Sequence, residues 1–354
     1  MSQVELQSIS KRFPTVTALQ NVSFSFKNGE FFVLLGPTGA GKTTTLRIVA
    51  GLLKQDAGRV LLDGKSIDDR TPAERDMAFV FQQYSLYPTM TVFDNLAFPL
   101  RSPMRKTPEP AIKVKVEDTA EKLRITHLLR RKTAQLSGGE MQRVAIGRAI
   151  VREPRLFLMD EPLSNLDAKL REALRVELKH LQKTQGSTTL FVTHDQIEAL
   201  TMADRIAVLD RGAVVQQGTP DDIYDRPATT FVAQLVGAPK INLLPAVRQS
   251  GSIQVTGCGI TVPAPRLELP EELLLGVRPE DIRPGPRGAF MAKVTLIEPL
   301  GVETILHLTS GGLTLLGLVP GMAAQKTGEE IRFDIVHEKL HFFGRDNVRI
   351  QEKK

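Results

Sequence analysis

The sequence contains a single cysteine, Cys258, among its 354 residues. One cysteine excludes an internal disulfide and any metal centre built from several cysteine ligands. The sequence also lacks a run of about twenty uncharged apolar residues, the length that a helix needs to cross a bilayer. Its first residues show no basic segment followed by an apolar core, so we expect no secretory signal. Together these absences favour a cytoplasmic protein.

The composition is that of a soluble globular protein, with 42% hydrophobic and 24% charged residues. The length predicts two domains rather than one. The net charge of +6 is modest, and no aromatic residues alternate with the basic ones as they do on many nucleic-acid-binding surfaces. We interpret the densest basic positions as solvated helix faces and expect no nucleic-acid partner. These positions are Lys113, Lys115, Arg130, Arg131 and Lys132.

Residues 1–236 alternate short apolar runs with amphipathic helical segments, the pattern of an α/β domain with a largely parallel sheet. The expected buried strands are 31–35, 77–81, 155–159, 188–193 and 206–210. Three other segments alternate apolar and polar residues, which predicts an antiparallel subdomain at the edge of this domain. They are 4–13, 22–26 and 58–62.

The character of the sequence changes twice after the first strands. Prolines cluster in the region 88–135, and the charged segment 111–123 is helical in character, which predicts a helical insertion. From residue 237 onward, short strands recur between glycine and proline turns, and apolar residues alternate around Gly257-Cys258-Gly259 as in a hairpin. We therefore expect a small all-β domain over 237–354, built as an OB-like barrel.

The most informative segment is a glycine-rich loop of the form G-x-x-x-x-G-K-T at residues 36–43. An apolar strand at 31–35 precedes it. Residues 44–53 after the loop are expected to form a helix, which we expect to end near Gly58. A strand, a glycine turn and a helix N-terminus direct several backbone N–H groups at one point, which suits a polyphosphate. The expected nucleotide ligands are Gly36, Pro37, Thr38, Gly39, Ala40, Gly41, Lys42, Thr43 and Thr44.

Within this phosphate loop two side chains have distinct expected roles. Lys42 would reach the β- and γ-phosphates, and the Thr43 hydroxyl would bind Mg²⁺. A chance match in a glycine-containing turn is the alternative, but the strand before the loop and the helix after it argue against that reading. The sequence therefore predicts a nucleoside triphosphate with Mg²⁺ as the ligand.

An acidic pair follows the apolar strand that ends at Met159. Asp160 would contact the Mg²⁺ held at Thr43, and Glu161 could polarise a water directed at the γ-phosphate. Each acid also has a structural reading, since Asp160 could cap the next helix and Glu161 could favour the dipole of its first turn. Taken alone, the pair does not decide between these readings.

The segment Leu136-Ser137-Gly138-Gly139-Glu140 decides the family, because it resembles the Leu-Ser-Gly-Gly-Gln signature of ATP-binding cassette (ABC) transporter subunits. The resemblance implies that these residues bind the γ-phosphate of ATP held by the phosphate loop of a second copy, so that ATP joins a head-to-tail dimer. Glu140 stands where the family usually has glutamine. Ser137-x-x-Glu140 is also a capping box, and a carboxylate near a polyphosphate is unfavourable.

The same resemblance assigns the remaining motifs. Gln82 is similar to the glutamine that contacts Mg²⁺ and the attacking water, although the adjacent Gln83 leaves that assignment open by one residue. Asp167 ends a segment similar to the D-loop, which crosses the dimer interface. His194 is similar to the switch histidine that contacts the γ-phosphate, and Phe13 stands where an aromatic ring stacks on adenine. The resemblance implies catalytic roles for Glu161, His194 and Gln82, and metal contacts for Thr43, Gln82 and Asp160.

The C-terminal segment limits the resemblance to a smaller group of ABC transporter subunits. Residues 274–281, with Gly276-Val277-Arg278-Pro279-Glu280 at their centre, are similar to the regulatory domain of the maltose-importer ATPase subunit and its sugar-importing relatives. Residues 296–301 and 342–344 fit the same OB-like domain. Such a domain could sense a small ligand or dock a regulatory protein, and the sequence does not choose between these roles.

The resemblance implies an ATP-hydrolysing subunit of a bacterial importer for a carbohydrate or related polyol. The implied partners are a second copy, two membrane-spanning permease subunits and a periplasmic or lipid-anchored solute-binding protein, with the chain peripheral on the cytoplasmic face of the inner membrane. Importers of phosphate esters, polyamines or metal oxyanions carry similar C-terminal domains and remain alternatives. A soluble ABC protein acting on nucleic acid is a further alternative, but the chain has one phosphate loop and no long heptad repeat. An inactive regulatory ATPase would not need both Glu161 and His194.

Overall fold

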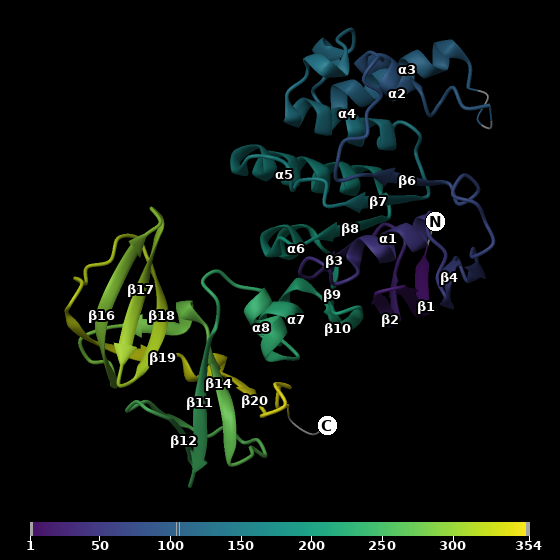
Figure 1. Cartoon of the computed structure of the whole chain (residues 1–354). Helices are drawn as coiled ribbons and strands as arrows, with labels where there is room; N and C mark the ends of the chain where they lie inside the picture. Colours follow the sequence, from purple (N-terminus) through teal and green to yellow (C-terminus); the bar gives the residue numbers. More distant parts are fainter. Residues whose placement is uncertain (1–2, 104, 106, 352–354) are drawn as a thin grey trace. The chain divides into compact units, whose positions relative to one another are not determined.

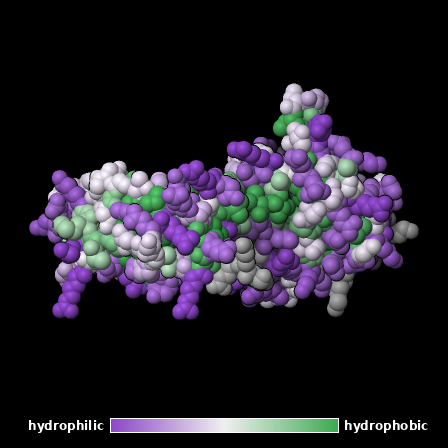
Figure 2. Space-filling view, turned by 90° about the horizontal axis from the view of Figure 1, so that it is seen from below, coloured by the Kyte–Doolittle hydropathy of each residue, from purple (hydrophilic) through white to green (hydrophobic). Residues whose placement is uncertain are grey.

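The computed structural model describes residues 3–103, 105 and 107–351. The chain forms two compact units, an N-terminal unit of residues 1–220 and a C-terminal unit of residues 221–354. None of the helices in the described part of the chain has the length and apolar composition that a membrane crossing requires. On the face shown in Figure 2, hydrophilic side chains predominate and apolar side chains form smaller groups.

The centre of the N-terminal unit is a six-stranded sheet whose first five strands in the chain are parallel (Figure 1). Their apolar residues are buried on both faces, as expected for parallel strands covered by helices. The expected strands are all present. In spatial order the sheet consists of β10 (Ala213–Gly218), β9 (Arg205–Asp210), β3 (Phe31–Leu35), β8 (Thr189–Thr193), β7 (Leu156–Asp160) and β6 (Met77–Val80).

A second, four-stranded antiparallel sheet forms the expected edge subdomain. Alternate residues of its strands face one core, and there Phe24 and Phe26 stack on Phe32 of β3 with ring centroids 5.2 and 5.1 Å apart. These contacts join the two sheets of the unit through buried aromatic surface. The sheet consists of β2 (Val16–Phe26), β1 (Val4–Phe13), β4 (Ala57–Leu62) and β5 (Lys65–Ser66).

Helix α1 (Lys42–Ala50) begins directly after the glycine-rich loop and packs on β7 and β8. It ends earlier than expected. Gly51 caps it in the left-handed conformation with φ of 75° and donates its N–H to Ile48 O. The guanidinium of Arg75 donates to Ile48 O and Val49 O, both at 2.8 Å. Gly58, where the sequence suggested the end, lies in β4 instead.

The remaining helices of this unit follow the expected pattern. The predicted insertion contains α2 (Val92–Ala97) and α3 (Glu109–Lys122), and both pack with α4 (Gly138–Ile150). Helix α4 also packs on β6, at the edge of the central sheet, and Figure 1 shows it among the helices of the insertion, away from α1. Helices α5 (Ala168–Gln185) and α6 (Gln196–Met202) complete the unit.

The C-terminal unit contains two five-stranded antiparallel sheets that share one apolar core. In the second sheet the outer strands β15 and β18 also contact each other, so it is the nearly closed barrel that the sequence predicted. In spatial order the first sheet consists of β13 (Thr261–Pro263), β12 (Ser252–Val255), β11 (Asn242–Gln249), β14 (Glu272–Val277) and β20 (His341–Phe343). The second sheet consists of β15 (Ile282–Pro284), β19 (Glu330–Ile335), β16 (Phe290–Pro299), β17 (Glu303–Ser310) and β18 (Leu313–Pro320).

The units divide between Pro220 and Asp221, before the expected boundary at 236/237. Helices α7 (Pro220–Asp225) and α8 (Thr230–Leu235) pack with the C-terminal strands, where Ala233 of α8 shares an apolar cluster with Ile241 and Phe343 and one buried arginine contacts both helices or their ends. Arg278, which is 2% exposed, donates to Val236 O at 2.7 Å and to Tyr224 O at 2.6 Å, and its guanidinium lies 3.8 Å from the Tyr224 ring centre. Arg278, which directly follows β14 in the Gly-Val-Arg-Pro-Glu segment, therefore connects these helices to the C-terminal strands.

His341 should make the C-terminal unit sensitive to acid. Burial, together with the charges of Arg278 and Arg349, lowers its pKa from 6.5 to about 4. Between pH 7 and 5 the unfolded chain therefore gains a proton that the folded unit does not accept. The free energy of unfolding should fall by about 2 kcal/mol over this range. Calorimetry of His341→Leu should show a weaker loss of Tm at pH 5, whereas the exposed control His337→Leu should match the parent. Equal loss in both variants would contradict this assignment.

Candidate active site

The glycine-rich loop connects β3 to α1, and two of its glycines are required by close packing. A Cβ atom at Gly36 would lie 2.2 Å from Leu209 O. Gly41 is the N-cap of α1 with φ of 102°, and a Cβ atom there would lie 2.6 Å from Ala18 O. Larger residues would displace β9 or β2, so these glycines keep the loop against the neighbouring strands.

Lys42 is the first residue of α1 and is only 5% exposed. Its ammonium group donates to Gly36 O at 2.9 Å and to Pro37 O at 3.0 Å, and Nζ lies 3.4 Å from Glu161 Oε1. The lysine is therefore folded back across its own loop. A buried ammonium needs such partners, because burial without them is costly.

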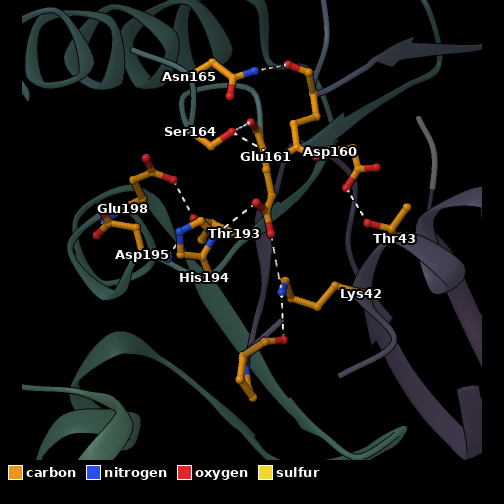
Figure 3. Close-up of polar contacts among 12 residues, drawn as sticks. Lys42, Thr43, Asp160, Glu161, Ser164, Asn165, Thr193, His194, Asp195 and Glu198 are labelled. Atoms are coloured by element: carbon orange, nitrogen blue, oxygen red, sulfur yellow. Dashed lines mark hydrogen bonds and ion pairs between the residues drawn. The ribbon is translucent and has the colours of Figure 1, made fainter. Parts of the chain in front are cut away.

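Thr43 and Asp160 meet across the space between α1 and the end of β7. The Thr43 hydroxyl donates to Asp160 Oδ1 at 2.9 Å (Figure 3). Burial raises the pKa of Asp160, and the nearby Glu161 also raises it, whereas the bond from Thr43 lowers it. The two residues place a hydroxyl and a carboxylate, both oxygen ligands suited to Mg²⁺, beside the phosphate loop.

Glu161 lies between Lys42 and His194 (Figure 3). Its Oε2 is 3.0 Å from His194 Nδ1, while its other oxygen faces Lys42. The backbone N–H of Glu161 donates to Val192 O, and the residue has a left-handed φ of 45° that turns the chain out of β7. Glu161 is 15% exposed and the imidazole 52%. Residues 42, 161 and 194, far apart in the sequence, thus form one polar chain.

The turn that carries His194 is bonded on both sides. Before it, the Thr193 hydroxyl donates to the buried Glu198 carboxylate at 2.6 Å. After it, Asp195 Oδ1 caps α6 by accepting from the backbone N–H groups of Ile197 and Glu198. Burial raises the pKa of Glu198. Thr193 and Glu198 were not among the residues expected at the site, although Asp-x-x-Glu before an apolar segment is a recognisable helix start.

Gln82, two residues after the end of β6, contacts the segment 164–167 that resembles a D-loop. Its Nε2 lies 3.4 Å from Ser164 Oγ, and its carbonyl accepts from Asn165 Nδ2 at 2.9 Å. The carbonyl of Gln83 instead accepts from Ser85. Gln82 is therefore the glutamine that faces this segment. Among the described contacts, none joins Gln82 to Thr43 or Asp160.

The signature segment begins α4 and adopts the capping box that its sequence allows. Ser137 Oγ accepts from the Glu140 backbone N–H, and Glu140 Oε2 accepts from the Ser137 backbone N–H at 2.7 Å. These bonds lower the pKa of Glu140. Leu136 is buried, and a Cβ atom at Gly139 would meet Leu170 at 2.1 Å. Glu140 thus serves as the acidic member of the capping box at the start of α4.

Two predicted residues lie away from the polar chain. Phe13 ends β1, pairs with Val16 across the hairpin and lies 5.8 Å from the ammonium of Lys11, measured at the ring centre. Asp167 caps α5 by accepting from the Leu170 N–H at 3.0 Å. In the described part of this single chain, no contact joins Phe13, Asp167 or the signature residues to the phosphate loop.

Comparisons with known proteins agree with this arrangement. Residues 19–164 match the ABC transporter family, and residues 275–343 match the TOBE domain. The chain is 45% identical to a trehalose/maltose import ATP-binding protein of Thermococcus litoralis, over 97% of this chain and 98% of that protein. It is 44% identical to an sn-glycerol-3-phosphate import ATP-binding protein of Jannaschia sp., over 99% of both.

Solved structures resemble the N-terminal unit. A dimeric ATP-binding cassette in a post-hydrolysis state, bound to ADP and phosphate, matches with a TM-score of 0.56 at 32% identity, over 61% of this chain and 98% of that one. Three observations indicate the same family. They are the match to the family model, the similarity to relatives over nearly their whole length, and the phosphate loop with its acidic and histidine partners. The chain belongs to the family of ABC transporter ATP-binding proteins.

Proposed function

We propose that this protein is the energy-coupling ATPase of an importer for a carbohydrate or related polyol compound. The observation that carries the ATPase assignment is the polar chain of Lys42, Glu161 and His194 beside the phosphate loop. The importer assignment is supported by near full-length similarity to ATP-binding proteins of trehalose/maltose and glycerol-phosphate import. A phosphate ester is the second candidate substrate, since several relatives are glycerol-3-phosphate import proteins.

ATP would bind at the loop of residues 36–44. Lys42 now bonds two loop carbonyls, and it would exchange them for phosphate oxygens when nucleotide enters. Thr43 and Asp160 would hold Mg²⁺, which neutralises phosphate charge when bound. Gln82, whose Nε2 lies 3.4 Å from Ser164 Oγ, would complete the metal set in this proposal. Phe13 would stack on the adenine ring.

Glu161 is the proposed general base. Its carboxylate would accept a proton from a water molecule as the water oxygen attacks the γ-phosphorus and the bond to the bridging oxygen of ADP breaks. His194, held 3.0 Å from that carboxylate, would orient it and contact the γ-phosphate. Lys42 would stabilise charge on the phosphate oxygens. This division gives each member of the polar chain one task.

The second half of the site would come from another copy of this chain. Ser137, Gly138 and Gly139 start α4, which packs on β6, whereas α1 lies over β7 and β8. In a head-to-tail dimer these residues would face the γ-phosphate bound by the partner, and Asp167 would lie at the interface. Backbone N–H groups at a helix N-terminus suit such a contact.

The helical insertion is the proposed docking region for a permease. It contains a groove of about 640 Å³ lined by residues that include Met90, Asp94, Phe98 and Arg101. Phe98 is 44% exposed, and Asp94 pairs with Arg101 at 3.0 Å. A lining that combines apolar side chains with an ion pair suits an amphipathic permease segment. Two permeases and a solute-binding protein would complete the importer, with this subunit peripheral on the cytoplasmic side of the membrane.

Glu161→Gln should slow ATP hydrolysis by roughly a hundred- to ten-thousand-fold, because it removes the general base while keeping the shape of the side chain. ATP binding should persist, and the variant should accumulate as an ATP-bound dimer in size-exclusion chromatography. The exposed Glu172→Gln on α5 is the matched control and should retain parental turnover. Parental turnover in Glu161→Gln would assign the base to another group.

Cysteine crosslinking tests the dimer. In a Cys258→Ala background, a Thr38→Cys chain mixed with a Ser137→Cys chain should form an ATP-dependent disulfide dimer. Each single-cysteine chain alone should not form this bond. Placing both cysteines in one chain distinguishes the arrangements further, since bonds within the chain would leave a monomer on a non-reducing gel. A predominance of such internal bonds contradicts the head-to-tail arrangement.

Uptake measurements test the transport role. A strain lacking this gene should lose uptake of one radiolabelled solute from a panel of maltose, trehalose, other sugars, polyols and glycerol 3-phosphate. The parental gene should restore uptake, and Lys42→Ala should not, because it deletes the cation directed at the β/γ-phosphates. Unchanged uptake of every solute would reject the proposed substrate class.

A further inference from the structure

One side chain of α5 connects the D-loop-like segment to the turn that carries His194. Arg171 Nη2 donates to Leu166 O at 3.0 Å and lies 3.5 Å from Ser164 O. On its other side, Nη1 lies 3.5 Å from Asp195 Oδ2. The planar guanidinium suits this arrangement, because its two terminal nitrogens point to different partners at once.

The Asp195 carboxylate divides its two oxygens between Arg171 and the helix that follows. Oδ2 faces Arg171, while Oδ1 accepts from the Ile197 and Glu198 backbone N–H groups at 2.7 and 3.3 Å. The Asp195 N–H donates to the Thr193 hydroxyl at 2.9 Å. A shift of Arg171 would therefore act on a turn that is bonded on both sides of His194.

The segment on the other side of Arg171 is also tied to the polar chain. The Ser164 hydroxyl donates to the Glu161 carbonyl at 2.9 Å, and Gln82 contacts both Ser164 and Asn165. The segment 164–167 thus contacts Gln82 and Glu161 through some of its groups and Arg171 through others. Since Arg171 also pairs with Asp195, and Glu161 contacts His194, these contacts form a closed path through the segment, Glu161 and the histidine turn.

An arginine on a helix surface often has no such role, and α5 offers a direct comparison. Arg175, one turn further along, makes no ion pair or side-chain hydrogen bond among the residues that the structure describes. Arg171, by contrast, has three polar partners from two other segments. Its Nε is buried and has no hydrogen-bond partner within the described residues. That donor remains available if the segment shifts.

We propose that Arg171 is a positioning residue that couples the segment 164–167 to His194. When the second subunit contacts Asp167, displacement of the segment moves the carbonyls held by Arg171, and the guanidinium transmits this movement to Asp195 and the histidine turn. His194 then reaches its catalytic position only when the segment is engaged. This inference rests on the proposed ATPase function and deepens it by naming the link between dimer contact and catalysis.

The test compares Arg171→Met with Arg175→Met, which makes the same change on the same helix. Arg171→Met should lower kcat about tenfold while the Kd for ATP of the single chain, measured with a fluorescent nucleotide, stays within twofold of the parent. The Hill coefficient for ATP should also fall, because turnover no longer follows engagement of the partner. Arg175→Met should keep all three values. A kcat for Arg171→Met equal to that of Arg175→Met overturns the inference.

Asp195→Asn provides a second variant that keeps the fold. Asparagine retains the helix cap but loses the charge facing Arg171. If the two residues act through one link, the double variant Arg171→Met/Asp195→Asn should be no slower than the slower single variant. Multiplicative losses would show independent effects and overturn the inference. Arg171→Lys should resemble Arg171→Met, because one ammonium cannot bridge both partners.

Hydrogen exchange separates positioning from a general loss of stability. With a non-hydrolysable ATP analogue, the parental dimer should protect the amides of residues 193–198. Arg171→Met should bind the analogue but lose that protection, with its melting temperature unchanged relative to Arg175→Met. Retained protection, or a loss spread over the whole N-terminal unit, would assign Arg171 a structural role only. If the parental chain itself fails to hydrolyse ATP, the proposed function fails instead.

Discussion

The parallel register of three neighbouring strands is the constraint on which the active site depends. Leu35 of β3 pairs with Thr193 of β8, and Asp160 of β7 pairs with Val192 of β8. The chain therefore leaves all three strands at the same edge of the sheet, and the next residues, Gly36, Glu161 and His194, belong to the proposed ATP site. Hydrogen bonds between strands fix this alignment far more tightly than loops could.

Hydrogen bonds and ion pairs then determine the conformations of the side chains that follow these strands. Lys42 is buried and would be costly without partners, so it bonds two loop carbonyls and the Glu161 carboxylate. Glu161 in turn holds His194. The same groups that suit phosphate binding thus satisfy one another within a single chain. Asp160, whose pKa is raised by burial, relies on the Thr43 hydroxyl in the same way.

The C-terminal unit uses a buried cation for a different purpose. Arg278 has a lowered pKa because burial disfavours its charge, yet backbone carbonyls of 224, 233 and 236 accept from it and the Tyr224 ring covers it. Tyr224 also donates to Glu280. This cluster is one of the contacts that attach α7 and α8 to the strands of the unit that begins at Asp221. The composition change near Gly237 marked the connector to the β-strands and missed the two short helices, because they are too short to show a period.

The sequence by itself determined the strands, the phosphate loop, the acidic pair and the all-β tail, because apolar period and glycine spacing are local properties. It also identified the Ser137–Glu140 capping box, whose partners are three residues apart. Only the tertiary structure decided that Arg171 reaches Asp195, that Gln82 rather than Gln83 faces Ser164, and that Arg278 holds α7 and α8. These contacts join distant segments whose geometry is set by packing, and no local pattern encodes which side chains packing will bring together.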